Sequence, residues 1–244
     1  MKHCLFAACA LYAGMLFAAP EAGSTAEINP NVKRWMFTPD PKLPNVLLIG
    51  DSISIGYTLD VRKALAGKAN VYRPMKEQGP ANCNGTTCGL KELESWLGTN
   101  KWAVIHFNFG LHDLKHVATP GSPTATSNPT DPRQAAPEVY AANLEKIVTR
   151  LEKTGARLVF ATTTPIQPGT NKPLREPEKA VEYNAIAVKI MENHRVAVND
   201  LHRFILPRLE ELQKPKDVHF TGPGSKVLGT EIAQKIQAML PAAR

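Results

Sequence analysis

The chain has few cysteines, and their spacing does not suggest a metal site. Four cysteines occur in 244 residues, and Cys4 and Cys9 lie in the first apolar stretch. The remaining two, Cys83 and Cys88, enclose the segment Cys-Asn-Gly-Thr-Thr-Cys, whose spacing does not suit half of a zinc site. No second cysteine pair follows in the sequence. We therefore expect neither a zinc-stabilised fold nor a resident metal.

The sequence also has a single long apolar run, residues 4–19, close to its start. Lys2 and His3 precede this run, and the small residues Ser24, Thr25 and Ala26 follow it. The run is shorter than the roughly 20 residues that a membrane span needs. We therefore interpret residues 1–26 as a secretory signal peptide. The mature protein is expected to be secreted or periplasmic, without stable insertion into a membrane.

No run of lysine and arginine occurs, although the chain is basic. Its formal net charge is +7, from 29 basic and 22 acidic residues that alternate along the sequence. A nucleic-acid-binding protein usually gathers its basic residues in a patch, often beside aromatic side chains. The spread of charge therefore favours an ordinary solvated surface over a nucleic-acid partner.

Removal of the signal peptide would leave Cys83 and Cys88 as the two cysteines of an exported protein. Disulfides form and persist in oxidising compartments. We therefore predict a Cys83–Cys88 disulfide that stiffens a short loop.

Apolar and amphipathic segments alternate from residue 45 onward, after an extended surface segment at 27–44. No internal repeat is evident, so residues 45–244 are expected to form one domain. The alternation of strands and helices predicts an α/β fold with a mainly parallel sheet of five strands, covered on both faces. The expected strands are 46–51, 70–73, 102–109, 156–163 and 195–199, and the expected helices are 57–67, 89–98, 137–154, 177–193, 203–213 and 224–239.

The first strand runs directly into Gly50-Asp51-Ser52. Gly50 permits a sharp exit from the strand. Ser52 would then lie at the carboxyl end of a parallel strand beside a helix N-terminus, where ligands of open α/β sheets bind. Ser52 is therefore a candidate nucleophile, although a serine at this point can equally be a helix cap.

Three further segments carry polar residues to the same edge of the sheet. The loop 78–89 offers backbone N–H groups that can donate to an oxyanion. The third strand ends at Gly110, which is followed by His112, whereas His106 lies inside the apolar part of that strand and is expected to be a hydrogen-bonded core residue. Asp217 and His219 precede the last helix, and histidine is the usual base for a serine nucleophile.

In order and spacing, these segments resemble the SGNH (GDSL-like) hydrolase superfamily over roughly residues 45–240. That family has a Gly-Asp-Ser block, a glycine in a second block, a Gly-x-Asn-Asp third block and a late Asp-x-x-His block. The resemblance implies a three-layer α/β/α sandwich of flavodoxin-like type and catalysis without a cofactor. It also assigns Ser52 as the nucleophile and His219 as its base.

The third block departs from the family pattern because His112 stands where the family has the asparagine of the oxyanion hole. A ring N–H can donate as an amide N–H does, but an imidazole titrates, so we expect a pH dependence that asparagine would not give. Asn108, four residues earlier, is an alternative donor.

The last and second blocks also leave alternatives open. Asp217 precedes His219 by two residues rather than three. Either the loop bulges so that Asp217 orients the ring, or a backbone carbonyl does so and the unit is a Ser–His dyad. In the second block the family's donor glycine falls at Asn84 or at Gly85, and Ser52 would supply a further backbone N–H.

The predicted function is that of an exported serine esterase. Small acyl groups, acetyl above all, would be removed from a carbohydrate or another ester through a Ser-His(-Asp) acyl-enzyme mechanism. Two alternatives remain. One is a lipase, lysophospholipase or thioesterase of the same fold, and the other is a binding module that keeps the fold without catalysis.

Overall fold

The computed structural model describes residues 30–77, 79–120, 122, 124–170 and 172–241. The expected signal peptide, residues 1–26, lies outside this set, so its prediction stands as made. Within the described residues, no helix combines the length and the apolar character needed to cross a membrane.

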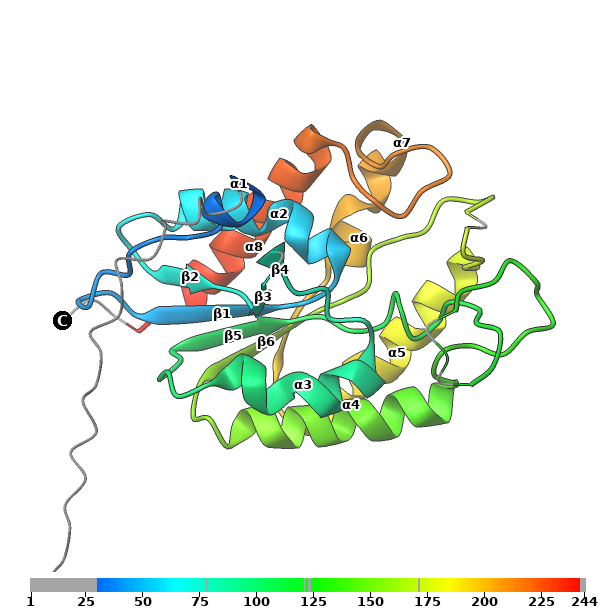
Figure 1. Cartoon of the computed structure of the whole chain (residues 1–244), viewed down its shortest axis with the longest axis horizontal. Coiled ribbons are helices and arrows are strands. Elements are labelled where there is room, and N and C mark those ends of the chain that lie inside the picture. The colour runs from blue at the N-terminus through cyan, green and yellow to red at the C-terminus, as the bar shows by residue number, and fades with distance from the viewer. Residues whose placement is uncertain (1–29, 78, 121, 123, 171, 242–244) are drawn as a thin grey trace, which may run out of the picture.

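The predicted five-stranded parallel sheet is confirmed (Figure 1). Its order is β2-β1-β5-β6-β7, and each neighbouring pair is parallel. The central strands are almost wholly buried because helices cover both faces, as their apolar sequences require. The strands are β1 (Asn45–Ile49), β2 (Asn70–Tyr72), β5 (Val104–Phe107), β6 (Arg157–Ala161) and β7 (Ala197–Asn199).

Helices form a layer on each face of the sheet, so the fold is a three-layer sandwich (Figure 1). One layer holds α2 (Ser52–Ala64) and α8 (Gly222–Met239), and the other holds α3 (Thr86–Leu97), α4 (Pro137–Glu152) and α5 (Pro177–Asn193). Short elements complete the described fold. They are α1 (Pro30–Lys33), the hairpin β3 (Met75–Lys76) and β4 (Gly79–Pro80), α6 (Leu201–Ile205), a 3-10 turn (Leu206–Arg208) and α7 (Leu209–Leu212).

The strand order places the switch point of the sheet between β1 and β5. The chain leaves β1 into α2 on one face of the sheet, whereas the chain that leaves β5 goes on to α4 on the other face. Connections that diverge in this way open a gap at the carboxyl ends of the two strands, and open α/β sheets bind their ligands there. The fold therefore places Ser52 beside the segment 108–113.

The segment before β1 is more structured than the sequence indicates. It was expected to be extended, but it contains α1, and Trp35 is only 5% exposed. The side chain of Arg62 donates to the Trp35 carbonyl at 3.0 Å and stacks over the Phe37 ring. These contacts dock the segment against α2, so it is part of the folded domain.

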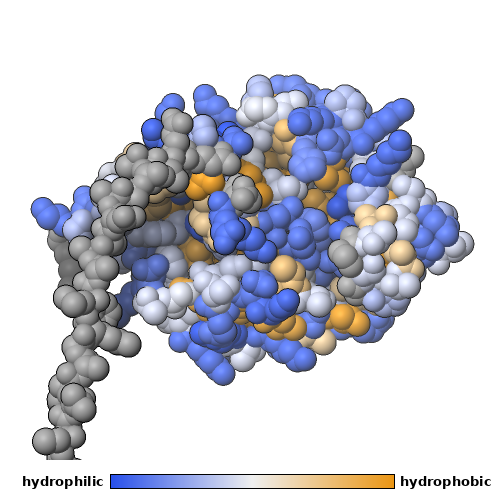
Figure 2. All heavy atoms as spheres, viewed as in Figure 1, coloured by the Kyte–Doolittle hydropathy of each residue, from blue (hydrophilic) through white to orange (hydrophobic). Residues whose placement is uncertain are grey.

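One face of the molecule is shown in Figure 2, where hydrophilic side chains predominate and apolar ones gather in small separate groups. The exposed large apolar side chains come from several different elements, among them Met36, Met75, Val181 and Leu206. Scattered apolar residues of this kind are normal on soluble domains.

Candidate active site

Ser52 is the first residue of α2, directly after the turn that follows β1. The carboxylate of Asp51 accepts a hydrogen bond from the Ile53 N–H at 2.9 Å and so caps the helix. This cap explains why α2 begins at Ser52, five residues before the apolar periodicity becomes visible in the sequence. A side chain at Gly50 would lie 2.8 Å from Ser54, so this turn requires glycine. Asp51, not Ser52, is therefore the cap, and the Ser52 hydroxyl is left for other contacts.

His219 lies against Ser52, with its Nε2 2.9 Å from the serine Oγ. The ring Nδ1 lies 2.7 Å from Oδ1 of Asp217. Burial alone would raise the pKa of Asp217, but hydrogen bonds from the backbone and ring of His219 outweigh it, and the pKa is lowered. The ionised carboxylate can only accept, so Nδ1 carries the proton and Nε2 accepts from the serine hydroxyl. Ser52, His219 and Asp217 thus form a hydrogen-bonded row.

The loop between α7 and α8 allows Asp217 to reach the ring despite its close spacing. Lys216 adopts a positive φ of 53°, and the backbone N–H of Lys214 donates to the carbonyl of His219. These features fold the loop back on itself. In the described structure Nδ1 contacts Asp217 and no backbone carbonyl, which is the geometry of the triad alternative rather than the dyad.

The second-block loop distinguishes between Asn84 and Gly85 as possible donors. The N–H of Gly85 already donates to the carbonyl of Cys83 at 2.8 Å, whereas that of Asn84 has no hydrogen bond to a described residue. Gly85 has φ of 87°, and a side chain there would lie 3.1 Å from the carboxylate of Asp113. Gly85 thus lets the loop approach Asp113, and Asn84 has the available N–H.

Asp113 anchors the start of α3 beneath this loop. Its Oδ1 accepts from both the backbone N–H and the hydroxyl of Thr86, at 2.8 and 2.6 Å. Burial raises the pKa of Asp113 to about 6, partly opposed by these hydrogen bonds. The last residue of the third block therefore positions the second block.

The predicted disulfide is wrong for this structure, because Cys83 and Cys88 are both free thiols. Cys83 is buried in the loop, where its N–H donates to the carbonyl of Gly50, and Cys88 lies within α3. Burial raises the pKa of the Cys83 thiol to about 12. The helix and the Asp113 contacts hold the loop without a covalent link.

His112 lies past the end of β5, where Nδ1 is 3.4 Å from the ammonium nitrogen of Lys115. Burial lowers the pKa of His112 to about 3, and the charges of Lys115, Arg175 and His219 act in the same direction. The expected titration of His112 near neutral pH is therefore not supported. The ring is therefore neutral over the ordinary working range.

Two further polar side chains, His106 within β5 and Asn108 directly after it, have different surroundings. The Asn108 amide donates one of its two N–H groups to the carbonyl of Ala161 at 2.8 Å, which holds the side chain against β6. His106 is fully buried as expected, but neither of its ring nitrogens has a hydrogen-bond partner. Burial, with a smaller contribution from the charge of Lys235, lowers its pKa to about 3. It is a neutral core residue.

Two cavities border this site. One of about 210 Å³ has Ser52 and His219 in its wall, together with Lys214 and the apolar side chains of Ile55 and Phe220. The other, of about 10 Å³, lies behind Asp51, with Leu111 and Asn108 in its lining. The larger cavity suits a small group, and the smaller has room for about one water molecule.

Arg175 is the functional candidate that the sequence reasoning missed. It lies in the long loop before α5, yet the residue is buried and its Nε donates to the carbonyl of Leu111 at 2.8 Å. Its charge interacts with Asp51 and Asp217. No spacing rule marks a loop arginine that folds inward, which is why this residue has no signal in the sequence.

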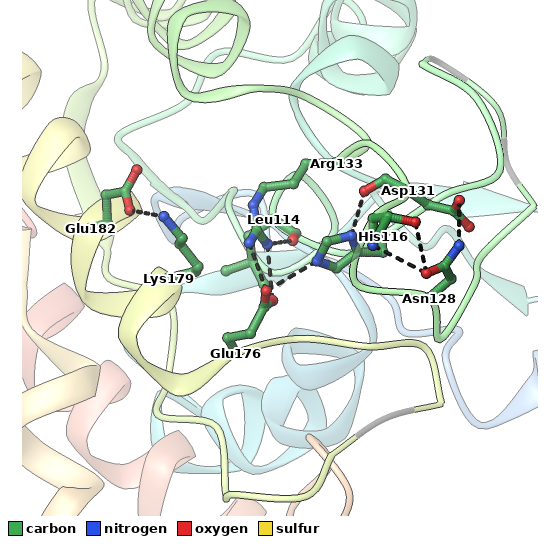
Figure 3. Close-up of polar contacts among 9 residues, drawn as sticks. Leu114, His116, Asn128, Asp131, Arg133, Glu176, Lys179 and Glu182 are labelled. Atoms are coloured by element: carbon green, nitrogen blue, oxygen red, sulfur yellow. Dashed lines mark hydrogen bonds and ion pairs between the residues drawn. The ribbon is translucent and has the colours of Figure 1, made fainter.

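A network of charged groups holds the two long loops together (Figure 3). Glu176 accepts two hydrogen bonds from Arg133, at 2.8 and 3.1 Å. Its Oε1 also lies 3.1 Å from Nε2 of His116, whose Nδ1 is 2.6 Å from the carbonyl of Asp131. The network joins the loop after β5 to the loop before α5. It thereby fixes the residue next to Arg175.

No cluster of three or more histidine, cysteine, aspartate or glutamate side chains suited to a metal ion is found among the described residues.

The comparisons with known proteins agree with this fold. The model of the GDSL-like lipase/acylhydrolase family matches residues 48–227. A search of curated proteins gave no match. The fold is similar to that of a lipase/acylhydrolase from Enterococcus faecalis, with TM-score 0.65, 20% identity and coverage of 82% of this chain and 99% of that one.

Two further solved structures have the same fold. An acetylxylan esterase from Geobacillus stearothermophilus has TM-score 0.60 and 16% identity, with coverage of 79% of this chain and 94% of that one. A putative acylhydrolase from Bacteroides fragilis has TM-score 0.62 and 15% identity, with coverage of 90% and 100%.

Proposed function

The chain belongs to the GDSL-like lipase/acylhydrolase family and is an ester hydrolase, and from that premise we propose that it removes short acyl groups, acetyl above all, from carbohydrate esters by an acyl-enzyme mechanism. The observation that carries the proposal is the hydrogen-bonded row of Ser52, His219 and Asp217, with spacings of 2.9 and 2.7 Å. This arrangement matches the relay of a serine hydrolase.

In the first half of the reaction the Ser52 hydroxyl attacks the ester carbonyl while Nε2 of His219 takes its proton. Asp217 holds the ring in the required tautomer and stabilises the imidazolium. The imidazolium then gives its proton to the leaving alcohol. Water enters, loses a proton to His219 and releases the acid, and Ser52 is restored.

The negative charge on the carbonyl oxygen needs donors that are already in place. We assign the backbone N–H groups of Ser52 and Asn84 and the neutral ring N–H of His112 to this oxyanion hole. The start of α2 adds the favourable field of a helix N-terminus. Gly85 shapes the loop and does not donate, because its N–H is occupied.

The size of the bordering cavities supports a short acyl group. They measure about 210 and 10 Å³, below the range of roughly 300–1,000 Å³ typical of drug-sized ligands. Two of the solved structures with this fold are acetylxylan esterases, which favours a carbohydrate as the alcohol part. Export of the protein, through the expected signal peptide at residues 1–26, fits an extracellular carbohydrate substrate.

Turnover of 4-nitrophenyl esters of increasing chain length tests the acyl preference. We expect the highest kcat/KM for acetate and a steep fall beyond butyrate. A maximum at eight carbons or more would instead indicate the lipase or thioesterase alternative. Covalent labelling by a fluorophosphonate, which requires an activated serine, separates both enzymes from a silent binding module. Acetate release from acetylated xylan then tests the carbohydrate.

A further inference from the structure

The two buried arginines of the described structure differ in how their terminal nitrogens are used. Those of Arg73 donate to Ser54, Thr58, Gly50 and Ala81. Arg175 is just as buried, at 6% exposure, but donates only through Nε, to the carbonyl of Leu111. Arg73 is therefore a structural crosslink, whereas the end of the Arg175 side chain has no such role.

The two terminal nitrogens of Arg175 have no hydrogen-bond partner among the described residues. Neither of them is completely shielded from solvent. They therefore reach solvent from within a buried side chain. A guanidinium with no partner is costly to bury, because charged groups lose hydration that nothing replaces. A ligand that accepted hydrogen bonds from these nitrogens would replace the hydration they have lost.

The contacts of Arg175 lie with segments that flank Ser52. Leu111, which binds its Nε, is the residue before His112 and lines the small cavity behind Asp51. The charge of Arg175 also interacts with Asp51 and Asp217. The guanidinium thus lies among segments that flank the proposed nucleophile, the oxyanion donor and the orienting acid.

The Arg175 backbone is held firmly from both sides. Its N–H donates to the carbonyl of Thr170 at 3.3 Å. The next residue, Glu176, is fixed by Arg133 and His116, as Figure 3 shows. A preorganised cation loses little conformational entropy when it binds a ligand. The charged network of the two loops thus restrains the backbone beside Arg175.

Neither nearby carboxylate lies within ion-pair distance of the Arg175 guanidinium. Asp51 caps α2 through Ile53, and Asp217 binds His219. Lys115 lies close as well, and the charge of Arg175 contributes to lowering the Lys115 pKa. A planar guanidinium with two free N–H ends suits a carboxylate, which it binds in a bidentate manner.

We propose that Arg175 binds a carboxylate on the substrate, so that the enzyme prefers esters that carry a negative charge close to the scissile bond. This inference rests on the proposed esterase function and deepens it. The carboxylate can come from the acyl part, as in a succinyl ester, or from the alcohol part, as in an acetylated uronic acid. Both sources present the same chemistry to Arg175.

Two matched substrate pairs separate these sources. The acyl pair is mono-4-nitrophenyl succinate and its neutral methyl ester, and the alcohol pair is an acetylated methyl glucuronoside and its neutral methyl ester. We measure the charged-to-neutral ratio of kcat/KM within each pair, from released nitrophenol or acetate. The ratio cancels effects that a substitution has on both substrates alike.

We expect a preference for the charged member in one pair. Arg175→Gln should lower that ratio by about tenfold to a hundredfold, the range of a charge-assisted hydrogen bond, and Arg175→Lys should keep part of the preference. The matched control is Lys101→Gln, which removes one positive charge from an exposed site just before β5. This site lies at the amino ends of the strands, opposite to Ser52, so the ratio should stay unchanged.

The inference is overturned if the wild type does not prefer the charged member of either pair, or if Arg175→Gln lowers kcat/KM of both members equally.

Failure of the esterase proposal has a separate signature, namely no turnover of 4-nitrophenyl acetate and no fluorophosphonate labelling. In that case calorimetry with the glucuronoside and with succinate still decides the role of Arg175. The calorimetry compares Ser52→Ala with the double variant Ser52→Ala/Arg175→Gln. The double variant should bind at least one of the two ligands about tenfold more weakly. Equal binding of both ligands to the two proteins overturns the inference. Thermal melts confirm that each variant folds.

Discussion

The ammonium group of Lys115 lies 3.4 Å from Nδ1 of His112 and decides which ring nitrogen carries the proton. An ammonium has donors and no acceptor, so Nδ1 must accept and the hydrogen lies on Nε2. Because the pKa of His112 is lowered to about 3, the ring keeps this form through neutral pH. In this form the ring has the N–H that the oxyanion role we propose for it requires.

His112→Ala should lower turnover by about 10²- to 10³-fold, the usual cost of removing one oxyanion donor. His112→Asn should recover much of this loss because it restores an amide N–H. If His112 merely packs, both variants lose melting temperature and asparagine rescues nothing. Steady-state kinetics beside thermal melts distinguish the two cases.

The pH profile tests separately whether His112 stays neutral during catalysis. With its pKa lowered to about 3, His112 becomes charged only at pH values well below 5. We therefore expect kcat/KM of the wild type and of His112→Asn to have the same shape between pH 5 and 8. An additional acid limb near pH 6.5 that disappears in His112→Asn would contradict the prediction.

Ser52→Ala should abolish esterase activity and leave the melting temperature within a few degrees of the wild type. The residue is half-buried at the start of α2, and Asp51 supplies the cap. Loss of a triad nucleophile costs several orders of magnitude in turnover. Residual activity within about tenfold of the wild type would remove Ser52 from this role.

Asp217→Asn should reduce kcat steeply with little change in KM. The amide keeps the shape of the side chain but favours the wrong tautomer of His219 and does not stabilise the imidazolium. His219→Ala serves as the fully inactive reference. More than about a third of wild-type turnover in Asp217→Asn would show a dyad, despite the 2.7 Å contact.

His106 should make the fold sensitive to acid. Its pKa is about 3 in the folded protein, against an ordinary value of 6.5, so the unfolded state takes up the proton first. The contribution of neutral His106 to the free energy of unfolding is therefore fully present above about pH 6.5. It falls as the pH drops toward 3, by about 1.4 kcal/mol per pH unit. His106→Leu should flatten this slope in urea titrations from pH 7 to 4. His112 contributes in the same direction, so part of the slope remains.

The sequence indicates the fold well because its signal is local and repeated. The buried runs at 46–49 and 104–107 are apolar enough to mark central parallel strands, and amphipathic segments of helical length lie between them. The start of α2 was placed too late because the Asp51 cap, not apolar periodicity, determines it. The hairpin β3–β4 is too short to carry any pattern.

The site was predicted unevenly for a similar reason. Ser52, His219 and Asp217 lie in short motifs, and the sheet topology brings the motifs together. Arg175 depends on a fold of the chain around it, and the choice between Asn84 and Gly85 depends on one backbone hydrogen bond. Interactions of these kinds have no signature in a linear pattern.

The Cys83 and Cys88 thiols are free in the described structure, so the loop between them is held by noncovalent contacts alone. The buried Cys83 thiol, with its pKa raised to about 12, stays protonated and slow to react until the loop opens. The rate at which the Cys83 thiol is alkylated therefore measures how often the loop that carries Asn84 opens.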